Sequence, residues 1–213
     1  MSHVFPVVKY GRAQVGLPSE HMTDLSLDLV RDRLAGVSPV RADPRGRIEA
    51  AVALTLAPAL DGDLHLLLIK RAARSDDPWS GQMALPGGRR DPGDRDLLAT
   101  ARRETREETA IDLQSARLLG ELDDLSPSTP HLPPILVRPF VFSLSDRPAV
   151  TTSDEVALYL WIPCKRLASA LVTEEIEVRG MPLVVRGYRI GPHLVWGMTE
   201  RILTPFLRLL TGR

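Results

Sequence analysis

The sequence predicts a domain of mixed α/β (α+β) class, a sandwich of strands and helices. Three observations lead to this fold: apolar strand-like runs from residue 50 onward, a run of good helix formers at residues 96–109, and amphipathic patterns near both ends. With 213 residues and 44% hydrophobic content, the chain suits one substantial domain with terminal extensions.

Residues 23–36 are expected to form an amphipathic helix that ends at Gly36. Charged residues separate its apolar positions, which are Leu25, Leu27, Leu29, Val30 and Leu34. A polar linker follows at residues 38–47. We therefore divide the chain into an N-terminal extension with helix and linker, residues 1–49, and a main domain, residues 50–213.

Residues 50–58 and 64–72 predict two strands joined by a hairpin-like Asp-Gly-Asp turn. Their continuous apolar runs suit strands that are buried on both faces. Residues 74–94 are rich in Gly, Pro and Asp, which indicates a loop, a brief strand at 82–85 and a second loop. The helix at 96–109 then has Asp94 or Asp96 available as its N-cap.

The rest of the chain continues the mixed pattern. Three strands are expected at residues 115–125, 135–144 and 155–163, and a short helix at 164–171. Residues 174–180 and 183–190 predict a hairpin, and residues 198–210 predict a closing amphipathic helix.

The balance of charge excludes some classes of partner. Lys+Arg and Asp+Glu are equal at 27 each, so no global field attracts a nucleic acid polymer or an anionic membrane. The longest apolar stretch, residues 50–60, is too short to cross a bilayer and contains a proline. Cys164 is the only cysteine, which excludes an intramolecular disulfide and a cysteine-rich zinc site. The N-terminus does not resemble a secretory signal. We expect a soluble, cytoplasmic protein with a small-molecule substrate.

Glu104, Glu107 and Glu108 place three carboxylates on one strip of the helix at 96–109, because residues three and four apart share a face. One interpretation is a solvated face on which neighbouring arginines offset the repulsion. The alternative is a metal site, because the Pro-Gly-Gly sequence at 86–88 lets the backbone approach a ligand closely. Such a loop facing carboxylates can hold Mg²⁺ or Mn²⁺ through oxygen ligands.

Residues 86–111 resemble the Nudix box, the signature of the Nudix hydrolases. Gly88 matches its leading glycine, Arg103 and Glu104 its Arg-Glu pair, Glu107 and Glu108 its Glu-Glu pair, and Ile111 its closing aliphatic residue. The resemblance implies a Nudix-type α/β/α sandwich with a central mixed sheet, and metal-binding carboxylates that the arginine orients. The spacing between Gly88 and Arg103 is one residue longer than usual.

Three substitutions also depart from the box. Asp94 stands where its first glutamate is expected, Ala110 replaces its second glycine, and Thr105 occupies an aliphatic position. The longer spacing and the acidic start resemble the coenzyme A pyrophosphatase branch of the family.

Two further segments resemble the same branch. Upstream, Arg74, Ser75, Gly81 and Gln82 fit its signature, whereas Trp79 stands where a histidine is typical and Leu85 replaces a phenylalanine. Downstream, residues 193–210 contain the Trp-Gly-x-Thr pattern that precedes the last helix. The resemblance implies a metal-dependent pyrophosphohydrolase that cleaves a nucleoside diphosphate linked to another moiety, with coenzyme A or its derivatives as the first candidate. Alternatives are nucleotide sugars, ADP-ribose or oxidised nucleotides, and a non-catalytic binding module.

The resemblance also implies roles for single residues. Glu104 and Glu108 are expected to bind Mg²⁺ or Mn²⁺ directly, together with the carbonyl oxygen of Gly88 or Gly87. Glu107 completes the cluster, either as a ligand through water or as the base that activates the attacking water.

Glu155 is the strongest additional candidate, since an acidic residue at this loop-to-strand position often faces the metal in the family. Its alternative is a solvated strand-entry carboxylate, and Asp154 competes for the role.

Three more side chains are candidates for substrate binding. Arg71 and Arg74 could bind the diphosphate bidentately, or lie at an ordinary surface. Trp79 could stack on a base, or serve as a packing anchor. Arg89 and Arg90 are expected to be solvated. The size of the chain and its apolar terminal helices permit a homodimer.

Overall fold

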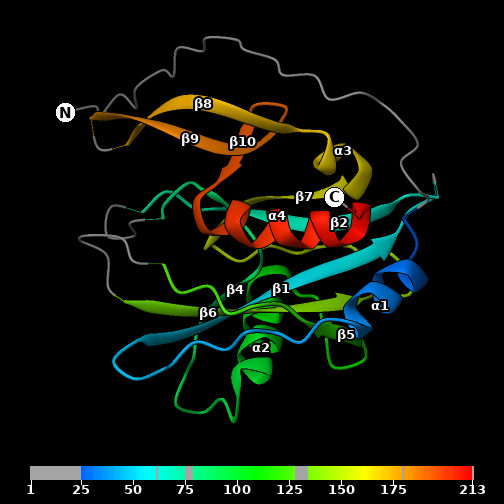
Figure 1. The fold of residues 1–213 in the computed structure, drawn as a ribbon. Helices are drawn as coiled ribbons and strands as arrows, with labels where there is room; N and C mark the ends of the chain where they lie inside the picture. The colour runs from blue at the N-terminus through cyan, green and yellow to red at the C-terminus, as the bar shows by residue number, and fades with distance from the viewer. Residues whose placement is uncertain (1–24, 61, 75–78, 128–133, 179, 213) are drawn as a thin grey trace.

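The computed structural model describes residues 25–60, 62–74, 79–127, 134–178 and 180–212. The helices are α1 (Leu27–Ala35), α2 (Leu97–Thr109), α3 (Cys164–Ala168) and α4 (Gly197–Thr211). The strands are β1 (Ile48–Pro58), β2 (Leu64–Arg71), β3 (Met83–Ala84), β4 (Gly87–Arg89), β5 (Arg117–Glu121), β6 (Ile135–Ser143), β7 (Val156–Pro163), β8 (Leu171–Val178), β9 (Met181–Ile190) and β10 (His193–Trp196). The predicted mixed α/β class with a central sheet between helices is confirmed (Figure 1).

The central sheet has seven strands. Its main path runs β3-β2-β1-β6-β5, with β4 paired to β1 and β7 paired to β2. β1 and β6 are parallel over the whole register from Ile48↔Ile135 to Leu56↔Ser143, and the other pairs are antiparallel. The sheet is therefore mixed, as the sequence predicts.

The sheet divides along β1. The C-terminal part of β1 pairs with β2, beginning at Leu56, whereas its N-terminal part pairs with β4 over Ala50–Val52. At the point of division the amide of Ala53 donates to the carbonyl of Pro86 at 2.8 Å. The Pro-Gly-Gly segment is thereby inserted between the two halves of the sheet.

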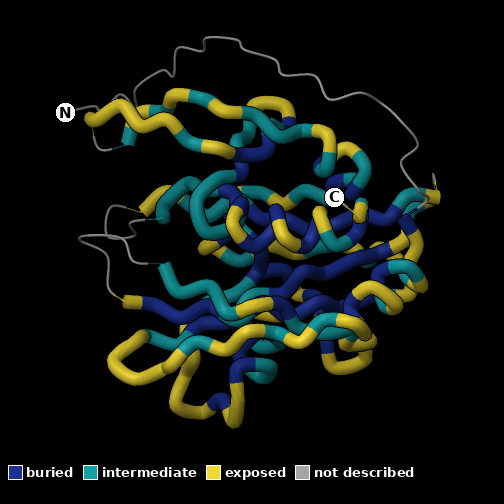
Figure 2. The backbone as a smooth tube through the Cα atoms, viewed as in Figure 1, coloured by how far each residue is buried: buried dark blue, intermediate teal, exposed yellow. Residues whose placement is uncertain are grey.

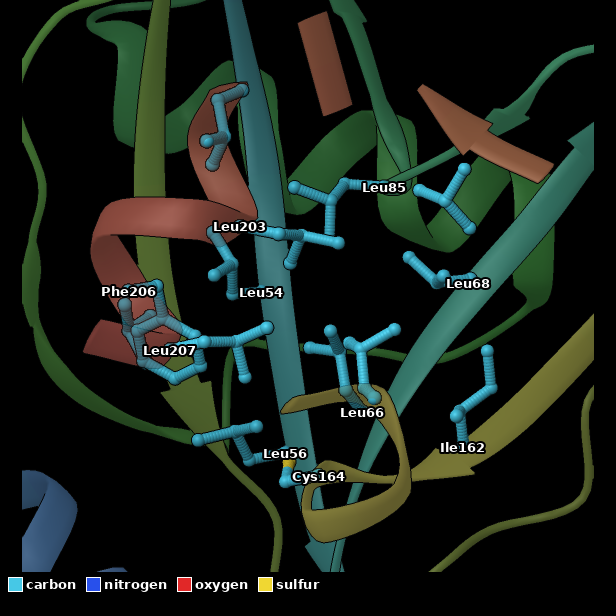
Figure 3. Close-up of a cluster of buried hydrophobic side chains, with 14 of the residues drawn as sticks. Leu54, Leu56, Leu66, Leu68, Leu85, Ile162, Cys164, Leu203, Phe206 and Leu207 are labelled. Atoms are coloured by element: carbon cyan, nitrogen blue, oxygen red, sulfur yellow. The ribbon is translucent and has the colours of Figure 1, made fainter. Parts of the chain in front are cut away.

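Each face of the central sheet has its own core. On one face, the small side chains of Ala51 and Ala53 lie with Ala101 of α2, Phe140 and Phe142. On the other face, leucines of β1 and β2 pack against α4, and Figure 3 shows the side chains of this second cluster. Figure 2 shows the central strands as buried backbone between more exposed helices and loops. β2 is buried at its first six positions, which agrees with its uninterrupted apolar sequence.

The helix α2 begins at its N-cap Asp96, whose side chain accepts a hydrogen bond from the amide of Ala99. Of the two N-caps expected, Asp96 is therefore correct and Asp94 is not. The helix ends at Ala110, whose φ of 57° is left-handed. Glycine adopts this conformation without the cost of a Cβ atom, which explains why the resembling motif has glycine there.

A second sheet of three strands has the order β10-β9-β8 and lies beside α4 (Figure 1). The predicted hairpin of β8 and β9 is confirmed. Two strands were not predicted: β10 has four residues and β4 has the sequence Gly-Gly-Arg, so neither shows the alternation that identifies a strand. Both form because a neighbouring strand supplies hydrogen-bonding partners.

The helix α1 packs through Val30 and Leu34, which belong to the same hydrophobic cluster as the buried side chains of α4. Residues 1–24 of the predicted extension lie outside the described residues, and the domain boundary at residue 50 stays a prediction. In the described part of the chain, no helix has the length and apolar character needed to cross a membrane.

Candidate functional site

A cavity of about 430 Å³ lies where the central sheet divides. This volume is within the range of small-molecule sites. Side chains from α2 and α4, which cover opposite faces of the sheet, both line it. Its charged lining residues are Glu104, Glu108, Glu155, Arg71, Arg74 and Arg89. The division of the sheet thus brings carboxylates and arginines into one cavity.

Glu108 is the most buried of these carboxylates, with 3% of the residue exposed. Its Oε2 atom accepts a hydrogen bond from the amide of Gly87 at 2.9 Å, and its Oε1 atom lies 3.9 Å from Nη1 of Arg71. Burial raises the pKa of the Glu108 carboxyl to about 8, and the negative charge of Glu104 adds to this effect. To be fully ionised at neutral pH, this carboxylate needs more positive charge than Arg71 supplies.

Glu104 lies directly against the glycine strand β4. A Cβ atom at Gly88 would come within 2.5 Å of the Glu104 carboxyl carbon, so only glycine leaves room for this carboxylate. Burial raises the pKa of Glu104, whereas the hydrogen bond from Nη1 of Arg103 at 3.0 Å opposes the rise. The two glycines therefore allow two helix carboxylates to reach the backbone of β4.

Arg103 holds the acidic strip together. Its Nε and Nη2 atoms donate to the two oxygens of Asp94 at 3.0 and 2.9 Å, and Nη2 also donates to the carbonyl of Arg89. Its Nη1 atom donates to Glu104 at 3.0 Å and to Glu107 at 2.9 Å. The ion pair with Glu107 joins residues four apart on α2, a spacing at which side chains of a helix meet. Because Asp96 and not Asp94 accepts the capping hydrogen bond of α2, the role of Asp94 is to fix the arginine that orients the glutamates.

Asp94 is buried, and its carboxylate also accepts a hydrogen bond from the hydroxyl of Thr100 at 2.9 Å. The hydrogen bonds from Arg103 lower the pKa of Asp94 from 3.8 to about 2. Asp94 is thus ionised throughout the physiological range and forms a permanent ion pair with Arg103.

Glu107 is placed differently from the other two glutamates. Its side chain is 53% exposed, it is bonded to Arg103, and it is not among the residues that line the cavity. Its role as a ligand or as the base stays a prediction, which would require either a water molecule or a change of rotamer.

Arg74 and Glu155 form an ion pair at the cavity, with 3.1 Å between Nη1 and Oε1. Backbone contacts position both residues: the amide of Arg74 donates to the hydroxyl of Ser80, and the carbonyl of Glu155 accepts from the amide of Ala72. The structure thus brings Glu155 into the lining, whereas Asp154 is not part of it. Residue 75, the serine of the upstream pattern, lies outside the described residues.

Arg71 and Trp79 also line the cavity, in agreement with their selection as substrate-binding candidates. Arg89 and Arg90 were expected to be solvated, and both are exposed. Arg89 also lines the cavity from β4, and Arg90 pairs with Glu49 at 3.1 Å. Because the strand β4 was not predicted, nothing in the sequence indicated that Arg89 would line the cavity.

The donor set of the cavity fits a divalent cation. Glu104 and Glu108 supply hard carboxylate oxygens, and Gly88 provides the cradle that a Cβ atom would fill. Among the described residues, no three His, Cys, Asp or Glu side chains are grouped closely enough to hold a metal ion by themselves. A cation here would therefore also need backbone, water or substrate oxygens, which is the usual manner in which Mg²⁺ is bound.

Residues of the C-terminal segment complete the cavity. Met198, Thr199 and Ile202 of α4 line it, together with Gln82 and Met83. The sequence singled out the Trp-Gly-x-Thr pattern only as a resemblance and gave these residues no role. Their proximity to residues 82–83 depends on the folding of the whole chain.

The mixed sheet between helices, and the acidic helix that faces a two-glycine strand across a cavity, define a Nudix-type hydrolase fold. The family model described as "NUDIX domain" matches residues 50–180. The chain therefore belongs to the Nudix hydrolase family, as the sequence predicts.

Several known proteins are similar to this chain. "Uncharacterized Nudix hydrolase NudL" of Photorhabdus laumondii is 34% identical over 71% of this chain and 80% of its own length. "Mitochondrial coenzyme A diphosphatase NUDT8" of Homo sapiens is 32% identical over 79% of this chain and 73% of its own length. A protein of Schizosaccharomyces pombe, "Uncharacterized protein C14C4.10c", is 40% identical over 52% of this chain, which spans only 34% of that protein.

Among solved structures, the crystal structure of a MutT/nudix family protein from Enterococcus faecalis has a TM-score of 0.53 at 15% identity. The similarity covers 87% of this chain and 68% of the other. This similarity confirms the fold, including the mixed sheet between helices.

Proposed function

We propose that this protein is a divalent-cation-dependent diphosphatase that hydrolyses a nucleoside diphosphate linked to another moiety. The observation that carries the proposal is that Glu104, Glu108 and Glu155 line the same cavity as Arg71 and Arg74. Carboxylates for cations and arginines for phosphate oxygens are the two groups of side chains that such a reaction requires.

Mg²⁺ or Mn²⁺ would be held by Glu104, Glu108 and the carbonyl oxygen of Gly88 or Gly87, where it neutralises phosphate charge and lowers the pKa of a bound water. The amide of Gly87 fixes the Glu108 carboxylate at 2.9 Å. Arg103 fixes the Glu104 carboxylate in the same manner. These contacts preorganise the ligands, so that little rearrangement is required when the substrate binds.

Arg71 and Arg74 bind the diphosphate. Each now faces a carboxylate, Glu108 and Glu155 respectively, so a bound phosphate would compete for a guanidinium that is already oriented toward the cavity. Glu155 is then released from its ion pair and can accept the proton of the attacking water. Its position in the lining favours Glu155 as the base over Glu107, which is not among the lining residues.

Coenzyme A or one of its derivatives is the first candidate substrate. The similarity to the human coenzyme A diphosphatase supports this choice, and so does the upstream pattern of Arg74, Gly81 and Gln82. Trp79 supports a second candidate group, namely nucleotide sugars, ADP-ribose or oxidised nucleotides, because it lines the cavity where the branch has a histidine and can stack on a base.

The test is hydrolysis of a panel of substrates with Mg²⁺ and with Mn²⁺, with products identified by mass spectrometry. The panel contains coenzyme A, ADP-ribose, a nucleotide sugar, a dinucleoside polyphosphate and oxidised dGTP. We expect 3′,5′-ADP to be released from coenzyme A by the wild type and not by Glu108→Gln. If the wild type cleaves another member of the panel but not coenzyme A, the assignment of coenzyme A as substrate is overturned. If it cleaves no member faster than Glu108→Gln does, the assignment as an enzyme is overturned.

Two other predictions concern the setting of the protein. A homodimer stays a prediction. So does the cytoplasmic location, because the name of the human relative places that protein in mitochondria and another relative, from Arabidopsis thaliana, is named as chloroplastic.

A further inference from the structure

Among the described residues that line the cavity, those of one wall carry no charge. The helix α4 and the strand β6 contribute Ile135, Val137, Met198, Thr199 and Ile202 to the lining. In the described part of the chain, the lining carboxylates and arginines come instead from α2, β2, β4 and the segments next to β2 and β7. The cavity thus combines a charged region that suits a diphosphate with a wall that offers mainly aliphatic surface.

The hydroxyl of Thr199 links the apolar wall to the strand β3 by a hydrogen bond. It donates a hydrogen bond to the carbonyl of Met83 at 3.2 Å, across 116 residues of sequence. Just before it, Gly197 has a φ of 68° and lies close to Gln82, whose Oε1 atom is 3.9 Å from the position of a Cβ atom on Gly197. The Trp-Gly-x-Thr pattern therefore meets the Gly-Gln pattern of the upstream segment in space.

Behind the cavity, the same helix is fixed to the three-stranded sheet. Glu200 is buried and accepts hydrogen bonds from Arg186 of β9 at 2.9 Å and from Thr204 at 2.8 Å. The hydroxyl groups of Thr204 and Tyr188 are 2.8 Å apart. Because α4 is held on both sides, the positions of Met198 and Ile202 are set before a ligand binds.

We propose that Met198 and Ile202 form a specificity wall that binds an apolar organic segment attached to the diphosphate of the substrate, and that Thr199 is the positioning residue that holds this wall. The proposal rests on the proposed diphosphatase function and specifies the chemical class of the group next to the diphosphate. An aliphatic chain gains from contact with such a surface, whereas a sugar ring would leave its hydroxyl groups without partners.

The test uses P1-methyl-P2-alkyl diphosphates whose alkyl group is methyl, butyl or octyl, so that no nucleobase competes for the wall. We expect kcat/KM of the wild type to rise by at least about tenfold from the methyl to the octyl ester, since a single methylene in an apolar pocket can have an effect of this size. Met198→Glu should remove most of this dependence. The matched control is Met181→Ala, because Met181 is an exposed methionine of β9 outside the lining.

Thr199 is tested by Thr199→Val, which keeps the shape and loses the hydroxyl, and by Thr199→Ser, which keeps the hydroxyl. We expect Thr199→Val to raise KM for the octyl ester several-fold while kcat changes less, and Thr199→Ser to restore KM. If Thr199→Val lowers the melting temperature but keeps the wild-type ratio of kcat/KM between the octyl and methyl esters, Thr199 has only a structural role and that part of the proposal is wrong.

Binding separates this inference from the function on which it rests. The corresponding alkyl esters of methylenediphosphonate cannot be hydrolysed at the bridge, so their Kd values are measured by calorimetry with Mg²⁺ present. Tighter binding of the octyl ester to the wild type, lost in Met198→Glu, supports the wall even if no ester is hydrolysed. The diphosphatase function is overturned separately, by absence of cleavage of every nucleotide substrate of the panel. Equal Kd values for the methyl and octyl esters overturn the proposal of a specificity wall.

Discussion

Replacement of Gly88 by alanine tests the close approach of helix α2 to the glycine strand. A Cβ atom at this position would lie 2.5 Å from the carboxyl carbon and from Oε1 of Glu104, and 2.6 Å from Oε2. Ordinary van der Waals contact begins at 3.4 Å, so the carboxylate must move by roughly 1 Å. Because the obstructing atoms are at the end of a flexible side chain, the displacement costs the fold little and falls on the geometry of the site.

A displacement of about 1 Å of a group that positions reactants can reduce the rate by roughly 100-fold, which equals about 2.7 kcal/mol of transition-state stabilisation. We therefore expect Gly88→Ala to lower kcat/KM for the preferred diphosphate about 100-fold at saturating Mg²⁺. Its urea midpoint and circular dichroism spectrum should remain close to those of the wild type.

The matched control is Gly36→Ala at the end of α1, where a Cβ atom would find its nearest neighbour, the carbonyl of Arg33, at 3.8 Å. This variant should retain full activity. If kcat/KM of Gly88→Ala stays within about threefold of the wild type, a difference of at most about 0.65 kcal/mol, then the position of the Glu104 carboxylate does not limit the reaction and the argument from Gly88 is refuted.

Further predictions concern the acidic helix α2 and Asp94, which precedes it. Asp94→Asn removes the charged acceptor of Arg103 and should destabilise the fold by roughly 1.5–3 kcal/mol in urea unfolding; a loss below about 0.5 kcal/mol would contradict the role of this buried ion pair. Because the folded-state pKa of Asp94 is lowered from 3.8 to about 2, its stabilisation should be complete above pH 4 and disappear as the pH falls toward 2. Acid titration of unfolding should therefore show a steeper loss of stability for the wild type than for Asp94→Asn, and equal slopes would refute the assignment. Arg103→Lys keeps one charge but cannot bridge Asp94, Glu104 and Glu107 at once, so it should lower kcat at least about tenfold, whereas Arg106→Lys on the same helix should not. Removal of divalent cations with EDTA should lower the melting temperature of the wild type and leave that of Glu108→Gln unchanged, as followed by differential scanning fluorimetry.

The long elements could be predicted from the sequence because their apolar periodicity is strong. The helix at 97–109 and the parallel strand at 135–143 lie where the pattern placed them. The short strands β4 and β10 could not be predicted, since two glycines or four residues carry no periodicity. β4 exists only because β1 pairs with two different strands along its length.

The functional site was predictable only where its residues are close together in the sequence. Glu104 and Glu108 lie four residues apart on one helix, so a local rule places them on the same face. The contrast between buried Glu108 and exposed Glu107 is not local, because it depends on which side of α2 packs against β4. The contact between Thr199 and Met83 spans 116 residues and depends on the packing of α4.

The most direct test of the account is the binding of Mn²⁺ by the protein, measured by isothermal calorimetry together with hydrolysis on the same samples. The account predicts that Glu108→Gln weakens Mn²⁺ binding by at least about tenfold and lowers kcat/KM by on the order of 100-fold, while the fold is retained. If Glu108→Gln binds Mn²⁺ and hydrolyses the diphosphate as the wild type does, the buried carboxylate of α2 is not part of a metal site and the central claim is wrong.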